Sequence, residues 1–275
     1  MVKADISGRT GIVTGGASGI GRAVASKLAE AGAGVIITDI DERQGIETVD
    51  KLRKKYRNGD KGITFIKADV SRKSEVDGMM SQVKDSYGKI HFLVNNAGIL
   101  IPRLLVDPAG KEEITEEIFD RMIAINQKGA FLCAQAAARE MIRYGTKGVI
   151  INVSSESGLE GSAGQSIYAS TKAALYSFTR SWAKELGKYG IRVAGVAPGI
   201  LEATALRSPE YERALAYTRG ISVEKLRQSY EEVSIPLGRA GTLEEVANVV
   251  CFLVSNLASY ITGTVINISG GKSRA

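Results

Sequence analysis

A serine, a tyrosine and a lysine in the middle of the chain have the spacing that an acid–base group requires. Tyr168 precedes Lys172 by four residues, and Ser155 stands thirteen residues before Tyr168. Residues four apart share one face of a helix, so the phenol and the ammonium can lie side by side. A neighbouring ammonium favours the phenolate and lowers the pKa of a tyrosine from its usual value of about 10. Such a phenol could exchange a proton with an alcohol or a carbonyl, although the same spacing also occurs on solvated helix faces.

A glycine-rich turn near the start of the chain has the composition of an anion-binding site. The run 15–21 lies between an apolar strand expected at 10–14 and a helical pattern over 23–31, and a second apolar strand is expected at 35–39. A lone glycine pattern is more often a simple turn, but this strand–turn–helix context is the one that a dinucleotide site requires. Glycines let a pyrophosphate approach the backbone N–H groups at the start of the helix. The predicted contacts in the turn are Gly15, Ser18, Gly19, Ile20 and Gly21.

Asp39, at the end of the second strand, indicates which dinucleotide is bound. It stands eighteen residues beyond Gly21, where a carboxylate can accept hydrogen bonds from an adenosine ribose. Its negative charge would repel a 2′-phosphate, and Asp41 and Glu42 add to that charge, whereas Arg43 partly offsets it. We therefore expect NAD(H) rather than NADP(H) as the cofactor.

Together the two sites resemble those of the classical short-chain dehydrogenases/reductases, and the resemblance runs along essentially the whole chain. Beyond the glycine turn and the Ser155/Tyr168/Lys172 group, the matching motifs are Ala68-Asp69-Val70, Asn95-Asn96-Ala97-Gly98, Asn126 and Pro198-Gly199. The resemblance implies further cofactor contacts at Asp69, Val70, Asn96, Ala97, Gly98, Pro198 and Gly199, together with Tyr168 and Lys172.

The same resemblance implies a catalytic tetrad of Asn126, Ser155, Tyr168 and Lys172. In this tetrad Tyr168 moves the proton and Ser155 binds the substrate oxygen. Lys172 holds the nicotinamide ribose and lowers the pKa of Tyr168, while Asn126 holds a water that relays the proton. Ser154 competes for the serine position, but the family's thirteen-residue spacing to the tyrosine selects Ser155.

Strands and helices alternate along the chain, which predicts one α/β domain over residues 1–275. Further strands are expected at 63–68, 90–94, 149–153, 191–196 and 264–268, and a capping box at 242–245 begins a helix that reaches Val254. The predicted fold is a single-domain, Rossmann-type, doubly wound parallel sheet of about seven strands with helices on both faces. Two insertions, at about 99–115 and 201–236, follow strands at the edge where such sheets bind ligands, and we expect them to form substrate walls.

The loops around the predicted site resemble those of the sorbitol-6-phosphate 2-dehydrogenases of Gram-positive bacteria, in segments 102–107, 152–166, 196–204 and 216–220. This resemblance implies NAD-dependent interconversion of sorbitol 6-phosphate and fructose 6-phosphate. The polar residues Glu156, Glu160, Gln165 and Glu202 suit a polyol, and a phosphate requires arginine or lysine. Arg103, Arg207 and Arg219 lie in the insertions, and the sequence does not choose among them. The predicted substrate contacts are Ser155, Glu156, Arg103 and Arg207.

Three alternative functions remain open. They are another sugar or polyol dehydrogenase, a 3-oxoacyl carrier-protein reductase, and a catalytically silent regulator that binds a dinucleotide. Asp39 and the polar loops argue against the acyl reductase, and the intact tetrad argues against the regulator. Thr204 stands six residues beyond Pro198, where five is commoner in the family, so its contact with the nicotinamide amide is not assigned.

Composition argues against several other kinds of site. The chain has one histidine, His91, and two cysteines, Cys133 and Cys251, in apolar runs, so neither a metal site nor a disulfide is expected. Its 36 basic and 30 acidic residues are spread along the chain, and no nucleic-acid partner is expected. No apolar run approaches about 18 residues, so we expect a cytoplasmic protein with no membrane partner. Its partner should be a small polyol or sugar phosphate, and the family resemblance implies a homotetramer through helices at about 115–144 and 166–188.

Overall fold

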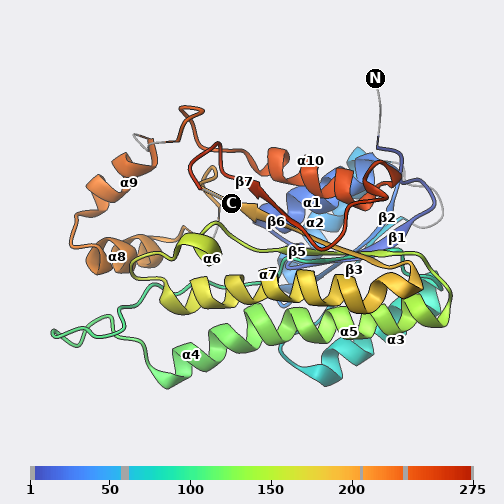
Figure 1. The fold of residues 1–275 in the computed structure, drawn as a ribbon, viewed down its shortest axis with the longest axis horizontal. Coiled ribbons are helices and arrows are strands. Elements are labelled where there is room, and N and C mark those ends of the chain that lie inside the picture. Colours follow the sequence, from blue (N-terminus) through green and yellow to red (C-terminus); the bar gives the residue numbers. More distant parts are fainter. Residues whose placement is uncertain (1–3, 57–61, 205–206, 232–234, 274–275) are drawn as a thin grey trace.

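Apolar, β-branched runs form a seven-stranded parallel sheet at the centre of the structure (Figure 1). The computed structural model describes residues 4–56, 62–204, 207–231 and 235–273. The order across the sheet is β3-β2-β1-β4-β5-β6-β7. The strands are β1 (Thr10–Thr14), β2 (Gly34–Asp39), β3 (Ile63–Lys67), β4 (Phe92–Asn95), β5 (Val149–Val153), β6 (Arg192–Pro198) and β7 (Val265–Ile268). The predicted fold class is confirmed, and every predicted strand is present.

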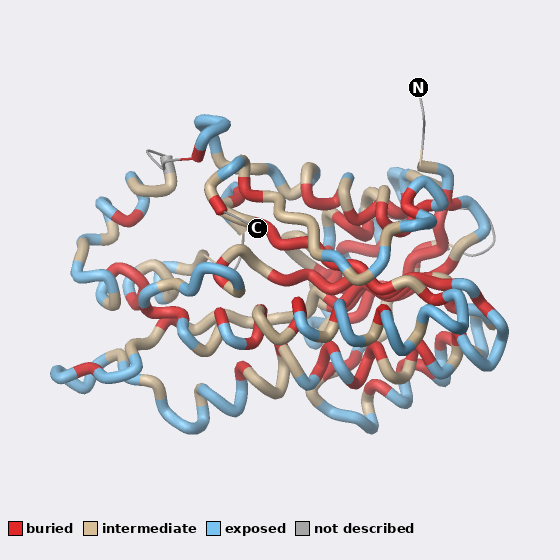
Figure 2. The backbone as a smooth tube through the Cα atoms, in the orientation of Figure 1, coloured by how far each residue is buried: buried red, intermediate tan, exposed pale blue. Residues whose placement is uncertain are grey.

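Successive residues of a strand face opposite helical layers, which explains why the strands are apolar throughout. Ile12 faces one core and Val13 the other, and Ile36 and Ile37 alternate in the same way. The first layer contains α1 (Gly19–Glu30), α2 (Glu42–Lys55) and α10 (Leu243–Val254), and the second contains α3 (Lys73–Tyr87), α5 (Gly129–Arg143) and α7 (Ser166–Leu186). The buried backbone in Figure 2 is concentrated in the sheet and on the inner faces of these helices.

The direction in which strands are added reverses between β1 and β4, which are neighbours in the sheet. In open α/β sheets the ligand crevice lies beyond the carboxyl ends of the strands at this reversal. The glycine turn 15–21 leaves the end of β1, and the 96–98 loop leaves the end of β4. The topology therefore brings together two motifs that are far apart in the sequence.

The remaining elements lie mostly around this crevice. They are α4 (Glu116–Met122), which continues through a π-helical turn η2 (Ile123–Lys128) into α5, together with α6 (Ser157–Glu160), α8 (Pro209–Thr218), α9 (Val223–Glu231) and the 3-10 turns η3 (Gly187–Tyr189) and η4 (Asn256–Ala258). The helices α8 and α9 belong to the second insertion and project together at one end of the molecule (Figure 1). Residues 205–206 and 232–234 of that insertion lie outside the described residues. Within the described ranges, no helix is long and apolar enough to cross a membrane.

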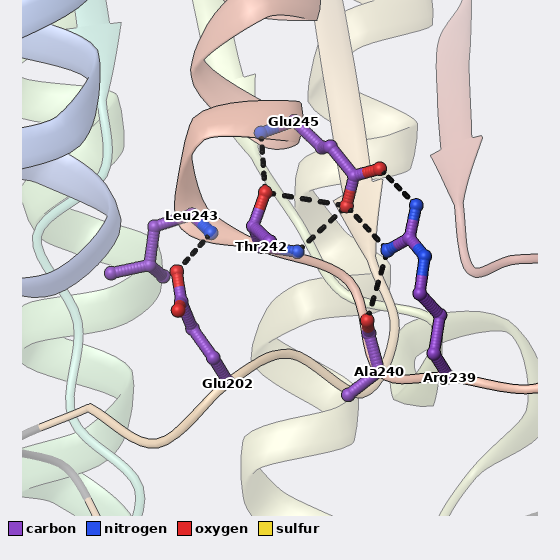
Figure 3. A network of polar contacts seen from close by, with 6 residues as sticks. All are labelled: Glu202, Arg239, Ala240, Thr242, Leu243 and Glu245. Atoms are coloured by element: carbon purple, nitrogen blue, oxygen red, sulfur yellow. Dashed lines mark hydrogen bonds and ion pairs between the residues drawn. The ribbon is translucent and has the colours of Figure 1, made fainter.

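Hydrogen bonds fix the segment after β6 to the start of α10 (Figure 3). The predicted capping box is confirmed, because Thr242 Oγ1 accepts from the Glu245 N–H at 3.1 Å and the Glu245 carboxylate accepts from the Thr242 N–H at 2.8 Å. Arg239 forms an ion pair with Glu245 and lowers the pKa of Glu245 to about 2. Glu202 accepts from the Leu243 N–H at 2.7 Å, so this carboxylate, which we expected to suit a polyol, also caps the start of α10.

Candidate active site

The carboxyl ends of the strands border a cavity of about 870 Å³. Three of the predicted site residues do not line it: Gly21 and Asn126, which lie in the turn and helix around it, and Arg103. The predicted residues that line the cavity are Gly15, Ser18, Gly19, Ile20, Asp39, Asp69, Val70, Asn96, Ala97, Gly98, Ser155, Glu156, Tyr168, Lys172, Pro198, Gly199 and Arg207.

The glycine turn fits the close approach of a phosphate group. Gly15 has a φ of +61°, and a Cβ on it would lie 2.8 Å from the Ala97 Cα. A Cβ on Gly21 would lie 2.1 Å from the Gly15 carbonyl oxygen. The Asn96 amide donates to the carbonyls of Thr14 and Gly15 at 3.0 and 3.1 Å. Asn96 therefore holds the shape of the turn, which leaves backbone N–H groups at the start of α1 for an anion.

Two carboxylates lie along the edge of the cavity beyond the glycine turn. Asp39 accepts from the N–H groups of Ala17 and Asp41, both at 3.2 Å, so its carboxylate is held at the end of β2. Asp69 accepts from the N–H and the hydroxyl of Ser71 at 2.9 and 2.7 Å. The ends of β2 and β3 thus hold both predicted cofactor carboxylates at the same edge of the cavity.

Ser155, Tyr168 and Lys172 meet at the other side of the cavity. Tyr168 and Lys172 come from the first two turns of α7, and Ser155 follows β5 and forms a hydrogen bond with Tyr168. Lys172 is 4% exposed, and its Nζ donates to the Val153 carbonyl at 2.8 Å. The same Nζ lies 5.6 Å from the centre of the Tyr168 ring. The helical spacing and the upstream serine therefore converge as the sequence predicted.

The ionisation of this group differs from the expectation. Burial raises the pKa of Tyr168 to about 12, and the hydrogen bond from Ser155 opposes that rise. Burial also lowers the pKa of Lys172 to about 8, because an ammonium is poorly solvated there. The predicted lowering of the Tyr168 pKa by Lys172 is not present in this structure, since desolvation dominates both groups.

The two candidate serines have different environments. Ser154 is 3% exposed, and its hydroxyl donates to the Lys172 carbonyl at 2.7 Å, which ties α7 to the end of β5. Both serines line the cavity, but Ser155 Oγ accepts from the Ser157 hydroxyl at 2.9 Å and forms a hydrogen bond with Tyr168. The geometry therefore favours Ser155 as the serine that could meet a substrate oxygen.

Asn126 lies in the π-helical turn η2, where the sequence indicated only a helix. Its amide oxygen accepts from the Ile99 N–H at 2.8 Å, and its amide nitrogen donates to the Ile99 carbonyl at 2.9 Å and to Thr171 at 3.1 Å. Both amide hydrogens and one lone pair of the amide oxygen are therefore engaged by the protein. These bonds fix the backbone beside Gly98, which Lys172 Nζ also approaches, and the relay water at Asn126 stays a prediction.

The structure separates the three candidate arginines. Arg103 forms an ion pair with Glu112 at 2.5 Å and borders a neighbouring cavity that Tyr168 does not line, so the predicted substrate contact of Arg103 is not supported. Arg207 and Arg219 both line the main cavity. Position in an insertion could not distinguish them, because the ion pair with Glu112 is formed only in the folded chain.

Sequence reasoning missed several residues of the cavity. Lys272, from the segment after β7, forms an ion pair with Glu156 at 2.6 Å. The second oxygen of Glu156 is buried, and within the described residues it has no hydrogen-bond partner. Tyr211 and Tyr230, from α8 and α9, also line the wall. None of these positions belongs to a motif, and no local signal in the sequence could have found them.

Comparison with known proteins identifies the family. Residues 15–273 match the family model described as enoyl-(acyl carrier protein) reductase. A solved short-chain type dehydrogenase/reductase from Mycobacterium marinum is 34% identical and has a TM-score of 0.83, over 98% of each chain. The chain belongs to the short-chain dehydrogenase/reductase family.

Two curated members of this short-chain dehydrogenase/reductase family illustrate the range of similar proteins. The sorbitol-6-phosphate 2-dehydrogenase of Klebsiella pneumoniae is 56% identical, over 96% of this chain and 95% of that protein. The 3-oxoacyl-[acyl-carrier-protein] reductase FabG of Thermotoga maritima is 38% identical, over 97% of this chain and 98% of that protein. The chain is therefore an oxidoreductase that acts on a CH–OH group, in a family that uses nicotinamide dinucleotides.

Other reactive side chains of this short-chain dehydrogenase/reductase have structural positions. His91 Nδ1 accepts from the Thr10 N–H at 3.1 Å, between neighbouring strands. Cys133 and Cys251 are buried free thiols, as predicted. Burial raises the pKa of both, that of Cys133 to about 12, so neither thiol is activated as a nucleophile.

Proposed function

We propose that this protein oxidises sorbitol 6-phosphate to fructose 6-phosphate with NAD⁺ as the hydride acceptor. The observation that carries this proposal is that one cavity joins the Ser155–Tyr168 pair to a carboxylate, Glu156, and to two arginines. A polyol phosphate needs these three kinds of group: an acid–base group, an acceptor for hydroxyls and a cationic site for a dianion. The similarity to the sorbitol-6-phosphate 2-dehydrogenase of Klebsiella pneumoniae supports the same substrate.

In this proposal the chain's own residues hold the reacting oxygen and move its proton. When bound, the nicotinamide ring supplies the acceptor for hydride. Ser155 Oγ donates a hydrogen bond to the substrate hydroxyl oxygen, and the Tyr168 phenolate oxygen accepts the hydroxyl proton. Lys172, whose Nζ lies 5.6 Å from the centre of the Tyr168 ring, would hold the nicotinamide ribose. Because the pKa of Tyr168 is about 12, the phenolate is scarce at neutral pH, so we expect oxidation to accelerate as the pH rises.

The preference for NAD rests on the charges around the end of β2. Asp39 has its carboxylate fixed at the cavity edge, where it could accept hydrogen bonds from both ribose hydroxyls. Arg43, which could have attracted a 2′-phosphate, is exposed and hydrogen-bonds to Glu47 at 3.4 Å. In the part of the chain that the structure describes, no cation forms an ion pair with Asp39, and an unneutralised carboxylate there favours NAD over NADP.

Glu156 is the proposed acceptor for a polyol hydroxyl. Lys272 holds one of its oxygens, and the other oxygen is buried and, among the described residues, unpaired. A buried acceptor without a donor is costly, and a substrate hydroxyl would satisfy it. Glu160 also lines the cavity beyond it.

A 3-oxoacyl carrier-protein reductase is the second candidate, favoured by the similarity to FabG of Thermotoga maritima. The charged lining at Glu156, Lys272, Arg207 and Arg219 opposes an acyl chain, because an apolar chain would remove these charges from water without offering them a polar partner. NADH absorbance at pH 8 to 9 with sorbitol 6-phosphate, free sorbitol and a 3-hydroxyacyl thioester separates the candidates. A kcat/KM for sorbitol 6-phosphate well above that for free sorbitol, with no turnover of the thioester, supports the proposal. Turnover of the thioester or of free sorbitol without turnover of sorbitol 6-phosphate would refute it.

A further inference from the structure

Two arginines give one end of the cavity a positive charge that no carboxylate neutralises among the described residues. Arg207 and Arg219 line this end, and no ion pair of either is found in the part of the chain that the structure describes. Other arginines nearby are paired, Arg103 with Glu112 and Arg227 with Glu212. An unneutralised pair of guanidinium groups in a cavity attracts an anion.

The guanidinium of Arg207 is held in a fixed orientation. It lies 4.1 Å from the centre of the Tyr230 ring, in a cation–π contact. One of its nitrogens donates to the Leu201 carbonyl at 2.6 Å, which leaves other N–H groups for a ligand. The Tyr230 hydroxyl is buried, and hydrogen bonding with the neighbouring Tyr211 hydroxyl opposes the rise that burial causes in the pKa of Tyr230, so two phenols offer polar groups at the same place.

Arg219, the residue that follows the last turn of α8, approaches the same end. Its guanidinium contacts the Ser162 hydroxyl at 3.4 Å, in the loop that connects α6 with α7. Tyr211 is within electrostatic reach of Tyr168 as well, and Gln165, the residue before α7, donates to the Tyr211 hydroxyl at 3.2 Å. Burial raises the pKa of Tyr211, while the charges of Arg219 and Arg207 oppose the rise, so both guanidinium groups are within electrostatic reach of this hydroxyl.

We infer that Arg207, Arg219 and the Tyr230 hydroxyl bind the phosphate group of the substrate. This inference rests on the proposed function, in which the phosphate and the reacting hydroxyl lie near opposite ends of the carbon chain. A phosphate held by α8 and α9 would direct the other end of the polyol toward Ser155 and Tyr168, with Glu156 beside the path. Arginine is suited to this role because its planar donors match phosphate oxygens in pairs.

The same chemistry could serve the pyrophosphate of the cofactor. The backbone N–H of Arg207 donates to the Thr204 carbonyl at 2.9 Å. The Thr204 side chain in turn lies 3.9 Å from the position that a Cβ on Gly19, in the glycine turn, would occupy. The test must therefore separate the Michaelis constant for the substrate from that for NAD.

The experiment compares Arg207→Gln and Arg219→Gln with the matched control Arg227→Gln, which removes the same charge from the same insertion where Glu212 already neutralises it. Steady-state rates are measured with sorbitol 6-phosphate and with free sorbitol. We expect each test variant to raise KM for sorbitol 6-phosphate by about 10- to 100-fold. The rate with free sorbitol, KM for NAD and the control should be unchanged. Thermal melting verifies folding, and Arg207→Lys, which keeps the charge, should recover part of the loss.

Several results would overturn the inference. If sorbitol 6-phosphate is turned over and both variants keep the wild-type KM, the phosphate is bound elsewhere while the proposed function stands. If KM for NAD rises instead, the arginines bind the cofactor. If the wild type acts on another phosphorylated polyol, the substrate assignment fails. The same comparison with that compound then shows whether the arginines bind its phosphate group. If only unphosphorylated compounds are turned over, both the proposed function and the phosphate site are refuted.

Discussion

At the scale of single residues, Lys172 lowers the stability of the fold, although the proposed chemistry requires it. Its ammonium is buried and, among the described residues, donates one hydrogen bond, to the Val153 carbonyl. Burial lowers the pKa of Lys172 from 10.5 to about 8. The pKa of Lys172 is lower in the folded protein than in the unfolded chain, so burying the charged lysine reduces the free energy of unfolding. This reduction is complete below about pH 8 and disappears as the pH rises to 10.5.

We therefore expect Lys172→Met to stabilise the protein while it abolishes activity. Removing the buried charge should raise the free energy of unfolding by about 3 kcal/mol, and losing the bond to Val153 should lower it by about 1 kcal/mol. The net increase is about 2 kcal/mol at pH 7. Urea unfolding at pH 7 and pH 10 measures this gain, which should vanish at the higher pH. Lys184→Met, exposed on the same helix, is the control. A variant less stable than wild type at pH 7 would contradict the argument.

Tyr168→Phe tests the proton transfer without changing the shape of the site. The variant lacks the hydroxyl that accepts the proton, so we expect kcat to fall by at least about 100-fold. NADH binding, followed by fluorescence, should persist because the ring and Lys172 remain. Activity near the wild-type level would mean that another group is the base. In the wild type, the oxidation rate should rise with pH toward the phenol pKa of about 12, and a flat profile would argue against Tyr168.

Asp39→Ala tests the cofactor assignment. Removing the carboxylate at the end of β2 removes both the ribose acceptor and the repulsion of a 2′-phosphate. We expect the ratio of kcat/KM for NAD to that for NADP to fall by about tenfold or more. Asp50→Ala, exposed on α2, should leave the ratio unchanged. An unchanged ratio in Asp39→Ala would refute the role of this carboxylate.

At the scale of elements, the two insertions form one connected wall. The Tyr217 hydroxyl of α8 donates to both oxygens of Asp107, at 3.0 Å each, and Asp107 also accepts from backbone N–H groups of the first insertion. The bond from the Glu112 N–H is the largest of the effects that hold the pKa of Asp107 below its usual value. The wall that carries Arg219 is therefore tied to the 99–115 segment.

Tyr217→Phe should loosen this wall without touching the reacting group. A hydrogen bond to a charged group contributes about 1.5–3 kcal/mol, and since part of that is recovered by water we expect KM for the substrate to rise by about 2- to 10-fold. The value of kcat should change little. Tyr260→Phe, fully exposed, is the control. A wild-type KM in Tyr217→Phe would show that the two insertions act independently.

The elements that carry short-range signals could be predicted from the sequence. The strands are apolar runs bounded by turns, and the α10 capping box is a four-residue pattern, so both depend on local chemistry alone. The π-helical turn around Asn126 was not predicted, and the bond between the Asn126 side chain and Ile99 joins residues 27 apart that only the fold brings together. Lys272 and Tyr230 reach the cavity only through the path of the chain in three dimensions.

Ionisation was also beyond prediction from the sequence. Spacing places Lys172 beside Tyr168, but the direction of each pKa shift is set by how deeply the fold buries them. The ion pair of Arg103 with Glu112 likewise depends on the fold of the 99–115 segment. Motifs therefore locate the chemistry, and packing determines its energetics.

At the scale of the whole molecule, we propose a homotetramer that uses the outer faces of α4, α5 and α7. These helices correspond to the ranges expected at an interface, and they carry the exposed aromatic side chains Phe119 and Phe131, at 42% and 39% exposure. Burying such side chains favours association. Light scattering coupled to gel filtration should give four times the mass of the chain, and a monomer mass would contradict the proposal.

Oxidation of a phosphorylated polyol by NAD⁺ in this cavity is proposed to proceed through Tyr168. The most direct measurement is NADH formation, followed by absorbance at pH 8 to 9, with sorbitol 6-phosphate and NAD⁺ for the wild type and Tyr168→Phe. We predict rapid NADH formation by the wild type and at least about a 100-fold lower rate for the variant. No NADH formation by the wild type, or equal rates for the two proteins, would contradict the claim.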